Sequence, residues 1–338
     1  MIGSWVGKMI NNPTLILVGR RKGGGAFTTD LHWDELTNTY FNLEHYQTNK
    51  TYDKDVTFLI SPDPYLDPEI RNIFKDKKVI IDLTWEGKYA KWGEVYNNKE
   101  PHHTVMYGSY SEKIESGVIF APMFWWYNTA LANISKGHDN YVPNRNYSKK
   151  FFMPMGGKRK WRDQVVSMLD PLLNDAYWSY QRRNKALPGD EVVKHYDIFA
   201  QNPMWYNDTC FSVVAESINT QQITNISPIF LTEKTFKPFS GQQPYMVIAA
   251  AGTLKFLLSQ GFETYDNIFN ELYDVETDFN KKMAIIVENI QNYEKVPHSE
   301  FTLEKIKHNF KKFYNMSDIV AGFEKEIVNP MYEYINSN

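Results

Sequence analysis

The chain has 338 residues, enough for two domains of about 150 residues each. Hydrophobic residues make up 42% of it and charged residues 23%, which is typical of globular domains and argues against long disorder. The formal net charge of −3 excludes a globally basic nucleic-acid binder, and the single cysteine, Cys210, excludes an intramolecular disulfide and a cysteine-based zinc site. No apolar run approaches the ~20 residues that span a bilayer, so we expect no membrane partner and a cytoplasmic location.

Short apolar runs in the first half of the chain predict strands. These runs are 14–19, 56–61, 78–83 and 118–121. They are continuous rather than alternating, which is typical of a parallel sheet covered on both faces. We therefore predict a Rossmann-like domain over 1–146, followed by a linker in the Asn- and Pro-containing segment 140–150.

The second half repeats the pattern of strand followed by helix. Its predicted strands are 150–155, 211–215 and 245–249, with a helix over 163–169. We predict a second α/β domain over 147–312, with a ligand bound at the carboxyl ends of its strands. The tail is helical by its pattern, and we assign 313–338 to a C-terminal helix that can pack back on the N-terminal domain.

A basic loop with three glycines follows the first predicted strand. Arg20, Arg21 and Lys22 lie in it, and they would attract an anionic substrate. The loop matches neither a P-loop nor a dinucleotide fingerprint, so a plain flexible loop is the alternative interpretation.

A carboxylate, Glu86, lies just past the predicted strand 78–83, beside Trp85. A general base needs a carboxylate at a ligand site within reach of the proton that it removes, and Glu86 has the position for this role. An exposed loop glutamate is the alternative.

A second basic stretch, 156–162, follows a predicted strand and opens a predicted helix. Backbone N–H groups at a helix start favour anions, and Lys160 and Arg162 add positive charge for phosphate oxygens. The stretch is a candidate phosphate site, with a solvated helix start as the alternative.

Acidic residues follow two further apolar runs. Glu216 comes directly after 211–215, and Glu233 and Lys234 come directly after 229–232. Glutamate can accept two ribose hydroxyls, and lysine can neutralise a diphosphate. On spacing alone Glu233 could equally favour the positive end of a helix dipole. The histidines show no metal-ligand spacing, and we predict no metal site.

Together these residues resemble the α-1,3-fucosyltransferase family and its bacterial and phage relatives. Val214-Ala-Glu-Ser217 and Phe230-Leu-Thr-Glu-Lys234 are similar to the family's Phe-Glu-Asn and Tyr-Val-Thr-Glu-Lys segments at the donor site. The stretch from 150 to 162 and Ala121-Pro-Met-Phe-Trp-Trp126 also resemble family segments. Ser217 departs from the family's asparagine, and Lys237 has no family counterpart and is expected at the surface.

The resemblance implies an inverting, metal-independent glycosyltransferase of the GT-B class. This fold has two Rossmann-like domains that face each other across a cleft, the first binding mainly the acceptor and the second mainly a nucleotide-diphosphate sugar. By the resemblance, Arg162 and Lys234 bind the diphosphate, Glu233 the ribose and Glu216 the donor sugar, while Glu86 is the base. No cofactor is required besides the donor.

The acceptor stays open between two classes. A hydroxymethylated base in phage DNA would be stacked by Trp85, Trp125 and Trp126 after flipping, and the enzyme would then act in the host cytoplasm. A surface polysaccharide or other glycan is the alternative, and a non-catalytic module that binds nucleotide sugars is a second one. A dehydrogenase is disfavoured because no dinucleotide fingerprint follows any predicted strand.

Overall fold

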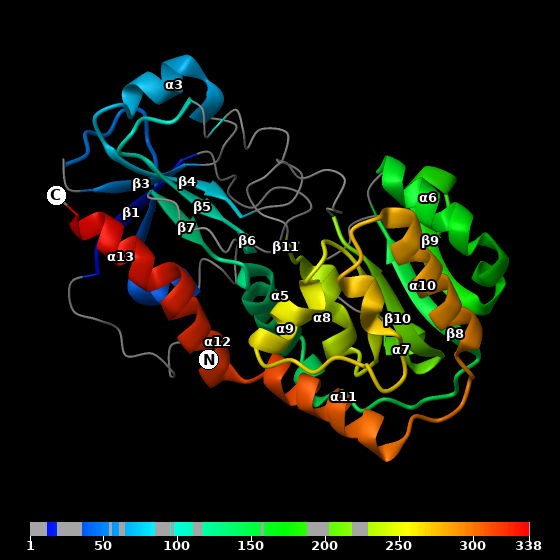
Figure 1. Ribbon diagram of the computed structural model, residues 1–338. Coiled ribbons are helices and arrows are strands. Elements are labelled where there is room, and N and C mark those ends of the chain that lie inside the picture. Colours follow the sequence, from blue (N-terminus) through cyan, green and yellow to red (C-terminus); the bar gives the residue numbers. More distant parts are fainter. Residues whose placement is uncertain are drawn as a thin grey trace. The chain divides into compact units, whose positions relative to one another are not determined.

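The computed structural model describes residues 12–18, 36–53, 56–60, 65–84, 95, 98–110, 117–156, 159–187, 203–217 and 229–337 (Figure 1). The chain forms two compact units. The first comprises residues 1–128 together with 319–338, and the second comprises residues 129–318.

The first unit contains a six-stranded sheet in the order β2-β1-β3-β4-β5-β7. Its strands are β1 (Thr14–Val18), β2 (Asn42–His45), β3 (Thr57–Ile60), β4 (Lys78–Leu83), β5 (Thr104–Tyr107) and β7 (Val118–Phe120). All neighbours are parallel. Every residue of β3 and all but the first of β4 are buried, because a doubly wound sheet is covered on both faces. The expectation of a parallel sheet in the first half is confirmed.

Helices from the first half of the chain and from its C-terminal segment complete the first unit. They are α3 (Pro68–Ile73), the start of α5 (Phe124–Ser135), the end of α12 (Met316–Phe323), the π-helical turn η7 (Glu324–Val328) and α13 (Asn329–Asn336), beside the short strand β6 (Ser109–Tyr110). The C-terminal segment is tied to this unit by hydrogen bonds: the Tyr40 hydroxyl donates to Glu324 at 2.8 Å, and the Lys78 ammonium donates to the carbonyl of Ile335 at 2.6 Å.

The second unit contains a four-stranded sheet in the order β12-β10-β8-β9. Its strands, β8 (Lys149–Met155), β9 (Ala176–Tyr180), β10 (Thr209–Ala215) and β12 (Tyr245–Ile248), are parallel to their neighbours. The helices are α6 (Lys160–Leu169), α7 (Pro203–Asn207), α8 (Glu233–Ser240), α9 (Thr253–Ser259), α10 (Phe279–Asn292) and α11 (Glu300–Phe313). Short elements are β11 (Ile229–Phe230), η3 (His138–Asn140), η4 (Asp170–Asp175), η5 (Gln181–Arg183) and η6 (Glu271–Asp274).

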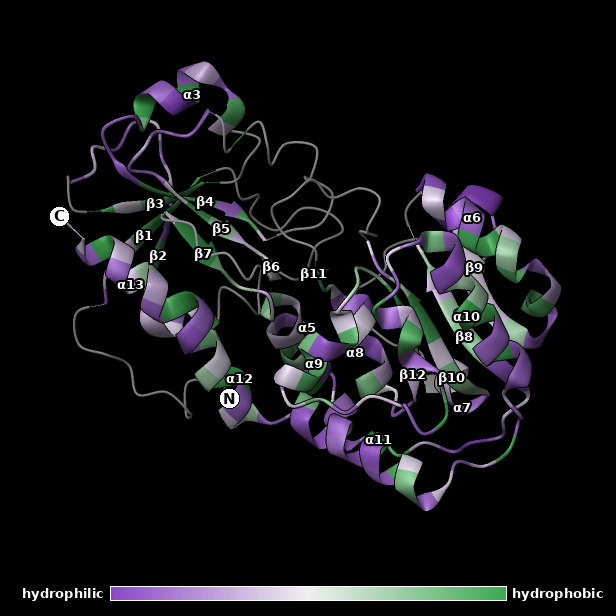
Figure 2. Cartoon of the chain, viewed as in Figure 1, coloured by the Kyte–Doolittle hydropathy of each residue, from purple (hydrophilic) through white to green (hydrophobic). Residues whose placement is uncertain are grey.

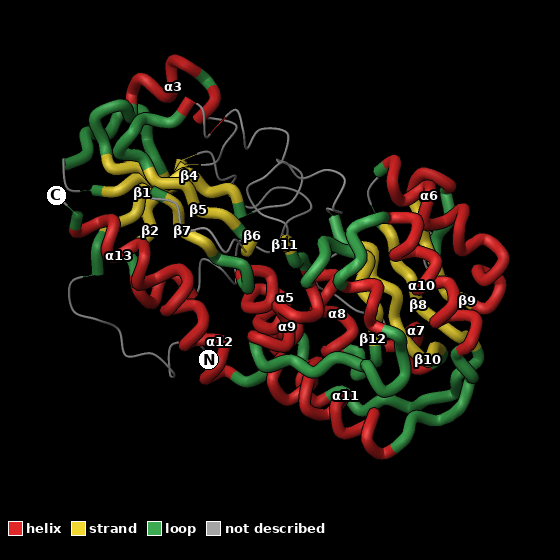
Figure 3. The backbone as a smooth tube through the Cα atoms, viewed as in Figure 1, coloured by secondary structure: helices red, strands yellow, loops and turns green. Residues whose placement is uncertain are grey.

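Hydropathy follows this layering. In Figure 2 the strands of the first sheet are largely hydrophobic, whereas α11 shows mostly hydrophilic residues. Helix α10 buries Phe279, Met283, Ile286 and Ile290, which recur at helical spacing and therefore form one apolar stripe. Figure 3 shows the strands of each sheet side by side among their helices.

The segment expected as a linker is held to the second unit. The half-buried side chain of Arg145 donates to carbonyls that include that of Gly241 at 3.0 Å, and Asn146 N–H donates to the carbonyl of Asn207 at 3.0 Å. The division between the units falls instead within α5, after Asn128.

The order of strands in the second sheet identifies its switch point. The chain passes from β8 through α6 to β9 in one direction, and from β10 through α8 to β12 in the other. Right-handed crossovers therefore place α6 and α8 on opposite faces of the sheet, as Figure 1 shows. Doubly wound sheets bind ligands where the connections diverge in this way, which here is beyond the carboxyl ends of β8 and β10.

Candidate functional site

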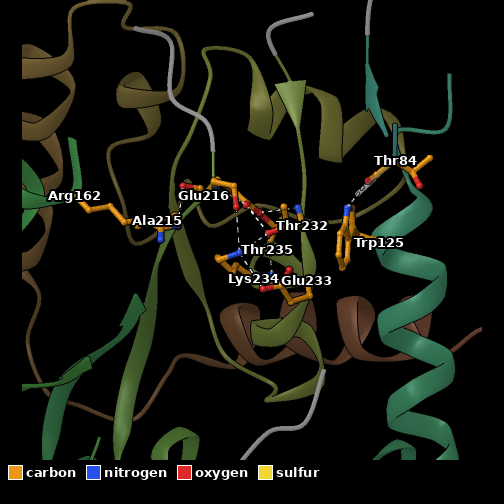
Figure 4. Close-up of polar contacts among 10 residues, drawn as sticks. Thr84, Trp125, Arg162, Ala215, Glu216, Thr232, Glu233, Lys234 and Thr235 are labelled. Atoms are coloured by element: carbon orange, nitrogen blue, oxygen red, sulfur yellow. Dashed lines mark hydrogen bonds and ion pairs between the residues drawn. The ribbon is translucent and has the colours of Figure 1, made fainter. Parts of the chain in front are cut away.

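Three of the predicted site residues lie together at the carboxyl end of β10 and the start of α8 (Figure 4). Glu216 follows β10 directly, and Glu233 and Lys234 are the first residues of α8. The helix begins there because Thr232 is its N-cap, with a side-chain oxygen that accepts from the Lys234 N–H at 3.4 Å. The structure thus unites two segments that the sequence placed separately at strand ends.

The carboxylate of Glu216 is completely buried and accepts four hydrogen bonds. Its Oε1 accepts from Thr232 N–H at 2.9 Å and from the Thr235 hydroxyl at 2.5 Å. Its Oε2 accepts from the Thr232 hydroxyl at 2.6 Å and from Ser217 N–H at 3.1 Å. A carboxylate offers about four acceptor positions, so these four donors fill the acceptor positions of Glu216. In this conformation Glu216 joins the end of β10 to the start of α8.

Arg162 connects α6, on the other side of the switch point, to the end of β10. Its guanidinium is 0% exposed, and its Nη2 donates to the carbonyls of Ala215 at 2.9 Å and Glu216 at 3.1 Å (Figure 4). The first turn of α6 is thereby coupled to the end of β10. A buried guanidinium contacts a bound ligand only after rearrangement, so direct contact between Arg162 and a diphosphate stays a prediction.

Glu233 and Lys234 form an ion pair of 2.9 Å whose side chains are only 7% and 12% exposed. The Lys234 ammonium also donates to the hydroxyls of Thr232 at 3.1 Å and Ser217 at 3.2 Å. Glu233 Oε1 accepts a hydrogen bond from the Lys234 ammonium, whereas its Oε2 is buried and has no hydrogen-bond partner among the described residues. Leaving a buried acceptor unpaired costs about 1–3 kcal/mol, so a molecule that donates a hydrogen bond to this oxygen would stabilise the site.

Lys237 departs from the expectation of a surface lysine. Its side chain is half-buried, one helical turn beyond Glu233. Burial lowers the pKa of Lys237 to about 8, with Glu233 opposing the shift and Lys234 and Lys136 adding to it. The sequence offered no signal for this, because burial of a lysine depends on which helices cover it.

Two of the three tryptophans predicted to stack an acceptor base, Trp125 and Trp126, are core residues. Trp125 and Trp126 are 1% and 3% exposed, so neither ring presents a face to a ligand, and their position does not support stacking. The Trp125 indole instead donates to the Thr84 carbonyl at 3.2 Å, and the buried Asp82 accepts from the Thr84 N–H at 3.0 Å and hydroxyl at 2.7 Å. Trp125 therefore steadies the end of β4.

Of the other predicted residues, Lys160 is exposed at the first position of α6. Glu86, Trp85 and the basic loop residues Arg20, Arg21 and Lys22 lie outside the described residues. Their assignments as base and acceptor contacts stay predictions.

Sequence reasoning missed the hydroxyl groups of the site. Ser217, Thr232 and Thr235 supply donors to Glu216 or accept from Lys234. A signal for Thr232 was present, since a threonine directly before Glu-Lys is typical of an N-cap. The contact from Thr235 to Glu216 had no signal, because it depends on how β10 and α8 pack.

The residues with described positions contain no group of three or more His, Cys, Asp or Glu side chains arranged to hold a metal ion. None of the helices among them has the length and apolar character to cross a bilayer.

The sequence matches no protein-family model, and a search of curated proteins found no match. Solved structures of alpha1,3-fucosyltransferase are similar in backbone. One has a TM-score of 0.49 at 9% identity, covering 93% of this chain and 94% of the other. A structure with GDP has a TM-score of 0.47 at 9% identity, with 93% and 95% covered, and one with GDP-fucose has 0.45 at 9% identity, with 92% and 94% covered. At this level of similarity only the geometry of the site bears on function.

Proposed function

We propose that the chain is a glycosyltransferase that moves a sugar from a nucleoside-diphosphate sugar to a hydroxyl acceptor. The observation that carries the proposal is the pair of Glu233 and Lys234, a buried carboxylate with an unpaired oxygen beside an ammonium group. It lies at the start of α8, after the strand β10 that borders the switch point of a doubly wound sheet. A nucleotide sugar offers the two groups that fit: ribose hydroxyls as donors and a diphosphate as the anion.

The chemistry follows from these two side chains. Glu233 Oε2 accepts a ribose hydroxyl, which satisfies the unpaired oxygen. Lys234 binds the diphosphate and stabilises the negative charge that grows on it as it leaves. Glu216 joins the end of β10 to the start of α8, and Arg162 joins the first turn of α6 to the same strand end, which fixes the positions of the donor-binding groups. Direct contact of Glu216 with the donor sugar stays a prediction.

The transfer itself is a single displacement. The acceptor oxygen forms a bond to the anomeric carbon as its proton passes to a carboxylate base, for which Glu86 is the predicted residue. The bond from the anomeric carbon to the diphosphate oxygen breaks, and that oxygen keeps the electron pair. Attack from the face opposite the leaving group inverts the anomeric carbon, which makes inversion part of the proposal.

The acceptor is proposed to be a glycan hydroxyl. Burial of Trp125 and Trp126 removes two of the three rings that were expected to stack a DNA base. The formal net charge of −3 also disfavours a phosphate backbone as partner. Duplex DNA that bound tightly at low salt and weakened steeply with added salt would favour the DNA acceptor instead.

Donor turnover tests the proposal. The wild-type protein is incubated with UDP-, GDP- and TDP-sugars, and the release of free nucleoside diphosphate is measured with and without glycan acceptors. We expect turnover of one donor and its loss in Lys234→Ala, whereas Lys307→Ala, which changes an exposed lysine on α11, keeps it. Absence of both binding and turnover of every donor refutes the proposal, and binding without turnover supports the non-catalytic module.

A further inference from the structure

Lys237 is a second lysine on the side of α8 that carries Glu233. It follows Glu233 by one helical turn, and a glutamate placed before a lysine at this spacing is the favourable orientation for a helical ion pair. Its half-buried side chain forms no hydrogen bond or ion pair within the described part of the chain. A buried-carboxylate oxygen and an uncommitted ammonium therefore lie close together on one helix.

The charges around Lys237 come from two elements. Glu233 favours its positive charge, whereas Lys234 on the same helix and Lys136, just after α5, oppose it. Helix α11 also packs against α8, and Tyr314, the residue after α11, contacts the Ser240 hydroxyl at the end of α8 with a pKa that burial raises. Asp139 acts on Tyr314, whereas Glu233 is the carboxylate among the described residues whose charge acts on Lys237, so Glu233 is its natural partner.

A bound donor diphosphate competes with the present hydrogen-bond partners of Lys234. Its three ammonium hydrogens are committed to Glu233, Thr232 and Ser217 in the ligand-free chain. A diphosphate that engages Lys234 withdraws hydrogen bonds from these partners. Removing one member of a buried ion pair is strongly unfavourable, because the remaining charge stays buried without compensation.

We propose that Lys237 is a positioning residue. It forms an ion pair with the Glu233 carboxylate when Lys234 turns to the diphosphate of a bound nucleotide sugar. The inference rests on the proposed function and deepens it. Lys237 lies one turn from the carboxylate, the spacing at which a glutamate and a lysine on one helix are neighbours, and the charge of Glu233 already acts on it. Glu233 then stays ionised and oriented toward the ribose while Lys234 binds the diphosphate leaving group.

Calorimetric titration with ADP, CDP, GDP and UDP tests the inference. We expect Lys237→Met to raise the Kd of the nucleotide that wild type binds by about tenfold, which corresponds to about 1.4 kcal/mol. Lys307→Met, at an exposed position on α11, leaves the Kd unchanged. Thermal melting of each variant shows whether it is folded.

A pH series separates positioning from a merely structural role. Burial lowers the pKa of Lys237 to about 8, so we expect wild-type affinity to fall as the pH rises from about 7 to about 9 and the lysine loses its charge. Lys237→Arg keeps its charge throughout, so its affinity stays level over the same range. Lys237→Met is weak at every pH and level as well.

The outcomes distinguish the two proposals. If wild type binds none of the nucleotides, the proposed function is refuted and this inference falls with it. If wild type binds one, but Lys237→Met binds it equally well or Lys237→Arg shows the wild-type fall with pH, this inference alone is overturned. Should Lys237→Met fail to fold, the pH profile of Lys237→Arg decides.

Discussion

Glu216→Gln tests whether the Glu216 carboxylate stabilises the folded protein or only contacts a donor sugar. The substitution keeps the size of the side chain but replaces one acceptor oxygen by an NH2 group. That group would face either the Thr232 N–H and Thr235 hydroxyl or the Ser217 N–H and Thr232 hydroxyl. The hydroxyl can turn and accept, but the backbone N–H cannot, so one buried N–H loses its partner.

The magnitude follows from these contacts. An unpaired buried N–H costs about 1–3 kcal/mol, and the remaining bonds lose the strength that the negative charge gives them. The total is about 3 kcal/mol, which lowers the melting temperature of a unit of this size by roughly 6–12 °C. We therefore expect Glu216→Gln to melt well below wild type in the absence of any ligand.

Thermal unfolding followed by circular dichroism measures this effect without an assay for activity. Glu304→Gln is the matched control, because Glu304 is exposed on α11 and the same substitution there changes no buried hydrogen bond. A Glu216→Gln protein that melts with wild type but binds or turns over the donor poorly would refute the stabilising role and leave Glu216 as a substrate contact.

Three further predictions follow from particular contacts. Trp125→Phe keeps a ring but removes the hydrogen bond to Thr84, and we expect calorimetry to show a loss of about 1 kcal/mol. Burial raises the pKa of Glu326 to about 7, so the folded state holds a proton that the unfolded state releases, and chemical denaturation should show stability falling as pH rises toward 7. Glu326→Gln should flatten that dependence, and an unchanged slope would contradict the assignment. Gly241→Ala places a Cβ 2.2 Å from the Tyr206 ring, and a melting temperature equal to that of wild type would show that this packing is wrong.

Most of the fold was predictable because buried parallel strands must be apolar on both faces. The runs that became β1, β3, β4 and β10 are continuous for this reason. Strands β2, β5 and β9 were not predicted. Exposed and half-buried residues alternate in β2, at the edge of its sheet, whereas β5 is buried but has only four residues and begins with Thr104.

The sequence by itself determined that Glu216, Glu233 and Lys234 lie at strand ends, because carboxyl ends of parallel strands share one edge of a sheet. Only the tertiary structure decided what each side chain does there. The hydroxyl of Thr235 reaches Glu216 across 19 positions, and Arg162 reaches the end of β10 across more than 50. Hydrogen-bond partners and burial depend on which distant segments pack together. Those contacts distinguish Glu216, whose two oxygens are both hydrogen-bonded, from Glu233, whose buried Oε2 has no partner among the described residues.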